Sequence, residues 1–398
     1  MSTSVLSDRL SQFNESATVA ISRRMDELRR AGRQIIPLNV GEPDFVTPVY
    51  IQRAGIQAIS DGFTKYPLTN GISELRTAIS RKLAVDNHLN YTVDEICVTN
   101  GAKQAICNAI LALCSRGDEV IVPTPCWVSY TDIVKLAGAV PVTVPCRSDW
   151  SLDLEAIEAA ITPKTKAVII CTPNNPTGAV YMEADLRQLG ELIVRRDLFV
   201  IVDEIYEKLI YDGMKHFSMA SISPEVWSRT LTVNGFSKAY AMTGWRVGYV
   251  AARRDIIRAV MRIQSQTTSG VCSIAQKAAC TALTGPQDDL NQMVRSFERR
   301  RDYVYRRICG HSHLSCTQPH GAFYLLVDIS FYLGKHCGDR VIQNGTDFAA
   351  FLLDEALVAV VPGEAFHAPN TVRISYSNSL ENLEKAMDQI ESALSRLD

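Results

Sequence analysis

The sequence is short of the features that mark zinc-binding, disulfide-rich and membrane-spanning proteins. Its 11 cysteines are scattered singly over 398 residues, and no two of them have the C-x-x-C spacing of a zinc or redox site. No run approaches the roughly 18 apolar residues of a transmembrane helix, and the first residues carry no apolar signal-peptide core. We therefore expect a cytoplasmic protein with reduced cysteines, no metal site and no membrane partner.

An excess of one charge is also missing. The chain has 41 Lys and Arg against 43 Asp and Glu, a net charge of -2 at pH 7, and the two signs are interspersed. Such a surface offers no broad basic face, so we expect no nucleic-acid partner. The hydrophobic fraction of 46% is ordinary for a globular enzyme, and the length allows two lobes, each with its own core.

The middle of the chain alternates short apolar runs with amphipathic helical segments. This alternation predicts an α/β fold with a mostly parallel sheet covered on both faces. Ligands of such sheets bind at the carboxyl ends of the strands, so the residues after each run are candidates for a site. The predicted strands are residues 96–98, 119–122, 140–144, 167–171, 198–202 and 231–233, and the predicted helices are 103–114, 127–136, 154–160 and 183–195.

Lys238 stands among small, aromatic and hydroxyl residues in the stretch NGFSKAYAMTGW, after the last predicted strand. A lysine in a partly apolar pocket loses its proton more easily than one in water and becomes an amine nucleophile. Ser237 and the nearby Arg246 carry the hydroxyl and guanidinium donors that suit a phosphate. An amine beside a phosphate clamp suggests pyridoxal phosphate (PLP), although the stretch alone is equally compatible with an ordinary loop lysine.

Other strand ends carry further groups that PLP requires. The turn from Gly101 to Lys103 opens a helix whose amides could hold a phosphate, and Asn175 lies in a proline-bounded loop that could aim an amide donor. Asp203, with Tyr206 after it, ends a very apolar strand, where a carboxylate would pair with a protonated ring nitrogen. Each has a plain alternative as a turn or a helix N-cap, but their joint occurrence is far more specific than any one of them.

With these residues in place, the chain resembles the fold-type I, class I aminotransferases of the aspartate aminotransferase superfamily, and most of all their bacterial-type aspartate branch. The resemblance implies a PLP-dependent transferase with a mostly parallel-sheet large domain and a smaller α+β domain. It also implies ping-pong transamination between an amino acid and a 2-oxo acid. The matching stretches include LNVGEPDF, GAKQA, TPNNPTGAVY, VDEIYEKL, GFSKAYAMTGWRVGY, GAFYLL, VVPGEAF and VRISY.

The resemblance implies a division of the chain as well. Residues 1–47 would form an N-terminal arm and part of the small domain, 48–290 the large PLP-binding domain, and 291–398 an interdomain helix and the small C-terminal domain. The active sites would be shared in a homodimer, in which Tyr66 reaches the phosphate of the neighbouring subunit. Closure of the small domain would bring Arg373 onto bound substrate.

For the cofactor, the resemblance implies a role for each matching residue. Lys238 would bond to the PLP aldehyde and then move the substrate proton, and Asp203 would pair with the ring nitrogen. Asn175 and Tyr206 would hydrogen-bond the phenolic oxygen, and Trp127 would stack on the ring. The phosphate would be held by Gly101, Ala102, Lys103, Ser237, Arg246 and the Tyr66 of a second subunit.

For the substrate, the resemblance implies that Arg373 clamps the α-carboxylate. Some relatives bind a distal carboxylate through an arginine that the stretch TTSGVCS lacks, whereas the branch resembled here uses a lysine matching Lys103. This favours aspartate or glutamate with 2-oxoglutarate as substrates. The predicted substrate-binding set is Gly41, Trp127, Asn175, Arg373, Lys103, Ser16 and Thr18.

Departures from the branch lie around the predicted substrate pocket rather than the cofactor: Asn70, Cys126, Gly270, Val271 and His367. They leave open a same-fold PLP enzyme that performs β or γ elimination, replacement or cyclisation. A rival of another class is a non-catalytic regulator, which carries a DNA-binding region ahead of this fold. Only about fifteen residues precede the first family-like position, so we expect an enzyme.

Overall fold

The computed structural model describes Ser7 and residues 17–398, and a seven-stranded sheet forms the centre of its larger part. The strand order is β2-β8-β7-β6-β5-β3-β4, and only β8 runs antiparallel to its neighbours. The strands are β2 (Ile96–Thr99), β3 (Glu119–Thr124), β4 (Val140–Pro145), β5 (Thr165–Cys171), β6 (Phe199–Asp203), β7 (Thr230–Gly235) and β8 (Gly248–Ala251).

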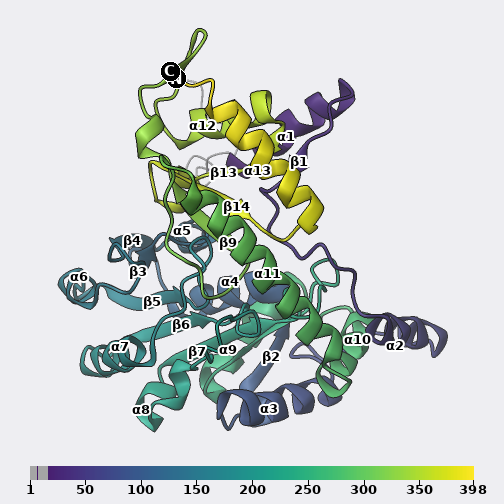
Figure 1. Cartoon of the computed structure of the whole chain (residues 1–398). Helices are drawn as coiled ribbons and strands as arrows, with labels where there is room; N and C mark the ends of the chain where they lie inside the picture. The colour runs from purple at the N-terminus through teal and green to yellow at the C-terminus, as the bar shows by residue number, and fades with distance from the viewer. Residues whose placement is uncertain (1–6, 8–16) are drawn as a thin grey trace.

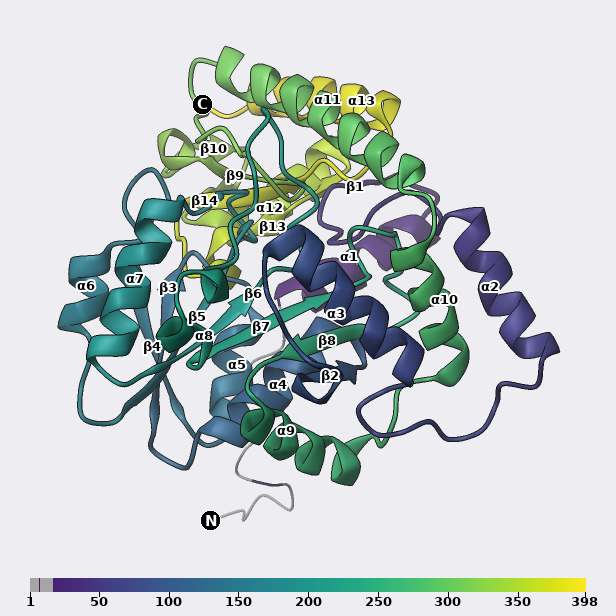
Figure 2. The ribbon, with the colours of Figure 1, turned by 90° about the horizontal axis from the view of Figure 1, so that it is seen from below.

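Helices cover both faces of this sheet, as Figure 2 shows from below. In β5 the side chains of Val168 and Ile170 join one apolar cluster, and those of Ala167 and Ile169 join the other. Burial on both sides explains why the strands read as continuous apolar runs. The helices of this part are α2 (Val49–Ser60), α3 (Ser73–Asn87), α4 (Gly101–Leu113), α5 (Ser129–Leu136), α6 (Leu154–Ala159), α7 (Glu183–Arg195), α8 (Pro224–Trp227), α9 (Arg254–Thr267) and α10 (Ser273–Thr284).

A smaller part lies above the large sheet in Figure 1, and the long helix α11 (Asp288–Gly310) runs between the two. Its sheet is antiparallel with the order β13-β14-β9, and β1 pairs with β12 in parallel. The strands are β1 (Ile36–Pro37), β9 (Tyr324–Asp328), β10 (His336–Cys337), β11 (Arg340–Val341), β12 (Val358–Ala359), β13 (Val361–Pro362) and β14 (Thr371–Ser375). The helices are α1 (Ala17–Arg30), α12 (Gly345–Phe351), which continues as a π-helix over Leu352–Ala356, and α13 (Leu380–Leu394).

The predicted mostly parallel sheet is confirmed, with one strand missed. No helix separates β8 from β7, so the alternation that marks the other strands gives no signal for it. Ahead of β9, an isolated bridge joins Ser315 to Asp328. None of the described helices combines the length and apolarity that a membrane crossing requires.

Arg301 fastens α11 to the loop after β6 and to the segment before β9. Its side chain is 1% exposed and donates to both carboxylate oxygens of Asp212, at 2.8 and 2.7 Å, and to the carbonyl of Pro319 at 2.7 Å. Hydrogen bonds from Arg301 hold the pKa of Asp212 well below its ordinary value, at about 2. The contact therefore ties the helix between the two parts to residues of both.

We expect Arg301→Met to destabilise the protein by about 2 kcal/mol, because it leaves the buried carbonyl of Pro319 without its donor and removes two of the hydrogen bonds to the Asp212 carboxylate. The contact of His320 with Asp212 and the partial exposure of Asp212 limit the loss. Since the pKa of Asp212 is lowered by folding, this stabilisation is present above about pH 4 and is lost as the pH falls further. Thermal unfolding of both proteins at pH 7 and at pH 3 measures it. Arg299→Met, at an exposed position of the same helix, is the control, and an equal decrease in both variants would contradict the expectation.

Candidate functional site

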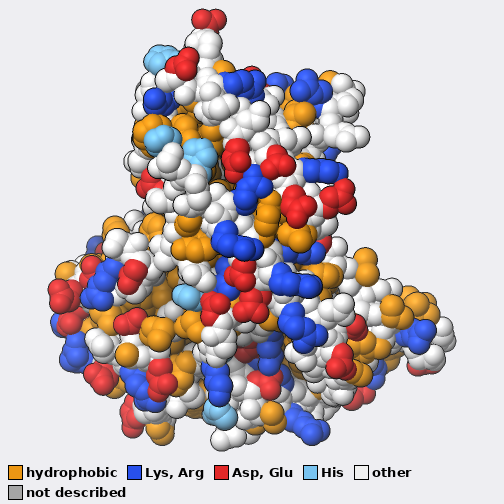
Figure 3. Space-filling model, viewed as in Figure 1, with side chains coloured by type: hydrophobic (Ala, Val, Ile, Leu, Met, Phe, Trp, Pro, Cys, Tyr) orange, Lys and Arg blue, Asp and Glu red, His pale blue; other side chains and the backbone are white. Residues whose placement is uncertain are grey.

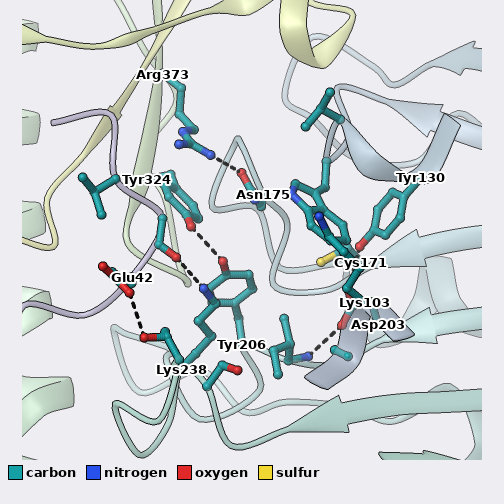
Figure 4. Close-up of a pocket in the computed structure, with 18 of the residues that line it drawn as sticks. Glu42, Lys103, Tyr130, Cys171, Asn175, Asp203, Tyr206, Lys238, Tyr324 and Arg373 are labelled. Atoms are coloured by element: carbon teal, nitrogen blue, oxygen red, sulfur yellow. Dashed lines mark hydrogen bonds between the residues drawn. The ribbon is translucent and has the colours of Figure 1, made fainter. Parts of the chain in front are cut away.

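A cavity of about 410 Å³ lies where the carboxyl ends of β5, β6 and β7 face the smaller sheet (Figure 4). Parallel strands of an α/β sheet direct their loops to this edge, which is why residues far apart in sequence meet there. Most residues predicted from the sequence line this cavity: Gly41, Ala102, Lys103, Trp127, Asn175, Asp203, Tyr206, Ser237, Lys238, Arg246 and Arg373.

Lys238 follows β7 and points its amine into the cavity, where Nζ donates a hydrogen bond to the carbonyl oxygen of Gly41. Burial, together with the positive charges of Arg373 and Arg246, lowers the pKa of Lys238 to about 8, although the carboxylates of Glu42 and Asp203 oppose the shift. With this pKa roughly a tenth of the amine is unprotonated at pH 7, far more than for an ordinary lysine, and the unprotonated form is the one that an amine nucleophile or general base requires.

Asp203 ends β6 and lies beneath the cavity, buried from solvent. The hydroxyl of Tyr130 donates to its Oδ2 at 2.8 Å, and the amide of Ile205 donates to Oδ1 at 3.2 Å. Burial raises the pKa of Asp203 to about 6, and these two hydrogen bonds limit the rise. No helix begins at Asp203, so the N-cap alternative does not hold, and the carboxylate is available to a cation in the cavity.

The start of α4 and Arg246 form a cradle for an anion. Gly101 has a φ of +77°, and a Cβ there would lie 2.6 Å from Nη2 of Arg246. Glycine therefore allows the guanidinium to approach the first amides of the helix, which carry the positive end of the helix dipole. Ala102 and Ser237 line the cavity beside them, so the geometry suits a phosphate group.

Arg373 lies on β14 and closes the opposite side of the cavity. Its guanidinium donates to Oδ1 of Asn175 at 3.0 Å and to the carbonyl of Asn39 at 2.9 Å, and it lies 4.4 Å from the centre of the Tyr324 ring. Its Nε is buried without a hydrogen-bond partner, and no ion pair joins it to a described carboxylate. A buried guanidinium in this condition is suited to a carboxylate ligand.

A second group of charges lies buried next to Asp203. Glu204, Glu207 and His216 are the only described residues that gather as potential metal ligands, and the ammonium of Lys82 contacts Glu207. Burial lowers the pKa of His216, but the carboxylate of Glu204 outweighs it and the net shift is upward. We interpret the group as a charge-balanced network that supports the end of β6.

Sequence reasoning gave no role to several residues of the cavity wall, and three of them carry functional groups at the site. Tyr130 holds Asp203, Cys171 at the end of β5 lines the cavity, and Tyr324 bonds Tyr206. Tyr324 stands inside the quoted stretch GAFYLL but received no role, because only the pairing of β9 with β14 places it beside Arg373. No local pattern in the sequence carries that information.

Three predicted assignments are left untested by the described part of the chain. Tyr66 is 96% exposed and does not line the cavity. Ser16 lies outside the described residues, and Thr18 lies in α1 at a position whose side chain is not described. Their predicted roles stay predictions.

Two of the departing residues stand where the backbone favours glycine. A Cβ at Gly270 would lie 2.8 Å from Cγ of Pro67, so the close approach of these two loops requires glycine. His367 has a φ of +59°, in the left-handed region that favours glycine. Cys126 and Asn70 are buried, as is Val271.

Residues 33–390 match the family described as aminotransferase class I and II. The chain belongs to this family. This aminotransferase is 47% identical over 396 residues to a bifunctional aspartate aminotransferase and glutamate/aspartate-prephenate aminotransferase of Petunia hybrida, covering 98% of the chain and 82% of the relative. It is 44% identical over 387 residues to an aspartate aminotransferase of Geobacillus stearothermophilus, covering 97% and 98%.

Solved structures agree over the whole fold of this aminotransferase. An aspartate aminotransferase from Rhizobium meliloti superimposes with a TM-score of 0.96 at 44% identity, covering 99% of each chain. An aspartate aminotransferase from Thermus thermophilus with maleate gives a TM-score of 0.92 at 40% identity, covering 98% of this chain and 100% of that one. The predicted fold class and the predicted aminotransferase activity are therefore confirmed.

We expect the amine of Lys238 to react at a lower pH than that of an exposed lysine in cofactor-free protein. Its pKa is lowered to about 8, so the reactive unprotonated form accumulates as the pH rises through about 8. Reductive methylation from pH 6 to pH 10, followed by peptide mass spectrometry, measures the pH dependence at each lysine. Lys65, which is exposed, is the reference, and identical pH dependences for the two residues would contradict the expectation.

Proposed function

We propose that this aminotransferase binds PLP and moves an amino group between aspartate or glutamate and a 2-oxo acid such as 2-oxoglutarate. The observation that carries the proposal is the position of the Lys238 amine, whose pKa is lowered, between the anion cradle and Arg373. The guanidinium of Arg373 is buried and has no ion-pair partner among the described carboxylates. Relatives named aspartate aminotransferase support it, as does the Thermus thermophilus structure with maleate, which is a dicarboxylate.

The residues of the cavity fit PLP. The cradle of Gly101 and Arg246 suits the phosphate, and Asp203 offers a buried carboxylate for the protonated ring nitrogen. Lys238 supplies the amine, and the Trp127 ring lines the same cavity. When bound, PLP supplies an aldehyde for the amine and an electron-poor ring that stabilises negative charge at the α-carbon.

Each side chain then has a defined task. Arg373 binds the α-carboxylate of the substrate and orients it, and Asn175 holds the guanidinium in place. Lys238, unprotonated in part near neutral pH, takes the proton from the α-carbon and returns it. Asp203 is mostly ionised above pH 6 and holds the ring-nitrogen proton. The smaller sheet above the cavity keeps water from the reacting atoms.

Lys103 is the proposed contact of the distal carboxylate. Its Nζ lies 4.9 Å from the centre of the Trp127 ring at the cavity wall. Burial and the charge of Arg246 lower the pKa of Lys103, so a carboxylate nearby would restore the stability of its charged form. Ser16 and Thr18 are proposed to assist it.

Purified protein incubated with aspartate and 2-oxoglutarate should form glutamate and oxaloacetate in equal amounts. We expect Lys103→Met, which keeps the apolar stem over Trp127, to raise the KM for aspartate about tenfold while leaving the KM for alanine nearly unchanged, because only aspartate has a second carboxylate. Steady-state kinetics with both donors measures the split. Release of ammonia instead of formation of glutamate would contradict transamination and indicate elimination.

We further propose a homodimer with shared active sites. Exposed apolar side chains gather on α2 and the segments that flank it, and Figure 3 shows such side chains over the projecting helix. Monomeric proteins seldom expose patches of this kind, and a second copy would bury this one. In the dimer Tyr66 would reach the anion cradle of the partner. The apolar side chains are Val46, Val49, Ile56, Ile59, Tyr66 and Leu68.

The domain division stays part of the proposal. The seven-stranded sheet lies within residues 48–290, the three-stranded sheet lies within 291–398, and β1 of the first segment pairs with β12. These positions support boundaries near residues 47 and 290. Arg373 would then move with the small domain when it closes on substrate.

Replacement of Ile56 and Ile59 together by Asp should convert the dimer to a monomer, because two carboxylates would be buried at the interface without partners. Sedimentation velocity across a concentration series measures the assembly state. Leu136→Asp, at another exposed apolar position on α5, is the control and should remain dimeric. A wild-type protein that sediments as a monomer would refute the dimer.

A further inference from the structure

Two tyrosine hydroxyls meet in the wall of the cavity (Figure 4). The hydroxyl of Tyr206, in the turn after β6, lies 2.8 Å from the hydroxyl of Tyr324, the first residue of β9. Both side chains are buried, and their rings meet edge to face. One residue comes from the large sheet and the other from the small sheet, so this hydrogen bond joins the two parts at the site.

Each hydroxyl has a single proton, and the direction of the bond decides which proton remains. If Tyr206 donates, its proton lies in the hydrogen bond to Tyr324 and is not available to a group in the cavity. If Tyr324 donates, the proton of Tyr206 is free to point into the cavity. Apart from Tyr206, the hydroxyl of Tyr324 has no hydrogen-bond partner among the described residues. A Cβ at Gly41 would lie 3.1 Å from this hydroxyl, so backbone closes that side, and the Gly41 carbonyl already accepts from Lys238.

The Tyr324 ring also supports the carboxylate clamp. The guanidinium of Arg373 lies 4.4 Å from the ring centre, within the range of a cation–π contact. The pairing of β9 with β14 sets Tyr324 opposite Ser375, two positions from Arg373 and so on the same face of the sheet. The hydroxyl and the face of one ring thus contact two different functional residues.

We infer that Tyr324 is a positioning residue that donates its proton to Tyr206, so that the proton of Tyr206 is reserved for the phenolic oxygen of PLP, while its ring holds Arg373 for the substrate carboxylate. The inference rests on the proposed function, since it concerns the same cofactor and substrate. It adds a residue that couples the two binding events through one rigid side chain.

The charges around the pair keep both hydroxyls protonated. Burial raises the pKa of Tyr324 and of Tyr206, and the positive charge of Arg373 only partly opposes the rise. Nζ of Lys238 lies 5.7 Å from the centre of the Tyr206 ring, and Cys171 also lines the cavity. Glu42, Asp203 and Arg246 act on Lys238 beyond it. Each hydroxyl therefore keeps its proton throughout the neutral pH range.

The sign of a spectroscopic shift in the Tyr324→Phe holoenzyme tests the direction of the bond. Donation from Tyr206 to the phenolic oxygen stabilises the unprotonated form of the nitrogen that joins Lys238 to PLP. If Tyr324 donates to Tyr206, its loss weakens that donation, and the pH midpoint of the visible absorbance change rises by about half a unit. If Tyr324 is instead the acceptor, its loss frees the Tyr206 proton and the midpoint falls. A fall or no shift would overturn the inference.

A double variant tests whether Tyr324 acts through Tyr206. Tyr206→Phe should raise the midpoint further than Tyr324→Phe, and adding Tyr324→Phe to Tyr206→Phe should produce no additional shift. If Tyr324→Phe shifted the midpoint by the same amount in the Tyr206→Phe background as in the wild-type protein, the inference that Tyr324 acts through Tyr206 would be contradicted. Tyr332→Phe, a buried tyrosine whose hydroxyl faces His311 at 3.5 Å, is the matched control and should leave the midpoint unchanged.

Kinetics separates the ring from the hydroxyl. Tyr324→Phe should keep the KM for aspartate within about twofold, whereas Tyr324→Leu should raise it about tenfold because Arg373 loses the aromatic face. Equal KM values in the two variants would show that the ring of Tyr324 does not support Arg373. If the wild-type protein forms no visible adduct with PLP at Lys238, the proposed function itself fails. A normal adduct with an unshifted Tyr324→Phe midpoint refutes this inference alone.

Discussion

Burial of charged groups that lack full partners is the constraint on which the cavity depends. Two sheets hold Lys238, Asp203 and Arg373 out of bulk water. As a result the pKa of Lys238 is lowered and the pKa of Asp203 is raised, and each shift favours the uncharged form of the group. Such burial costs free energy unless opposite charges are supplied. A ligand with a phosphate, a ring cation and a carboxylate would supply opposite charges, so this burial favours the binding of such a ligand.

The two parts of the molecule divide this task. The large sheet presents Lys238, Asp203 and the anion cradle from neighbouring strand ends, where the backbone is rigid on both sides. The smaller sheet presents Arg373, and α11 joins it to the large sheet through the buried contact of Arg301. Arg301 therefore fixes the position of the helix that connects the two sheets.

What the sequence predicts and what it misses follow from the range of the contacts. Asp203, Asn175 and Lys238 could be found because each follows a strand directly, and parallel strands deliver their ends to one edge. Tyr324 was missed because its neighbours are set by antiparallel pairing with a distant segment, and β8 was missed because no helix separates it from β7. Tyr66 faces away from the cavity of its own chain, so no argument on a single chain can assign its contact.

The departures from the aspartate branch bear on specificity in the same physical terms. Gly270 is explained by the approach of Pro67, and His367 occupies a backbone conformation that glycine prefers; neither lines the cavity. Residues that do line it carry positive charge toward the substrate side, from Arg373 at one end to Lys103 at the other. In the proposed function, two cations at the cavity would favour a substrate with two carboxylates, because a neutral side chain would leave Lys103 without compensation for its burial. Dicarboxylate selection would therefore rest on the placement of these charges.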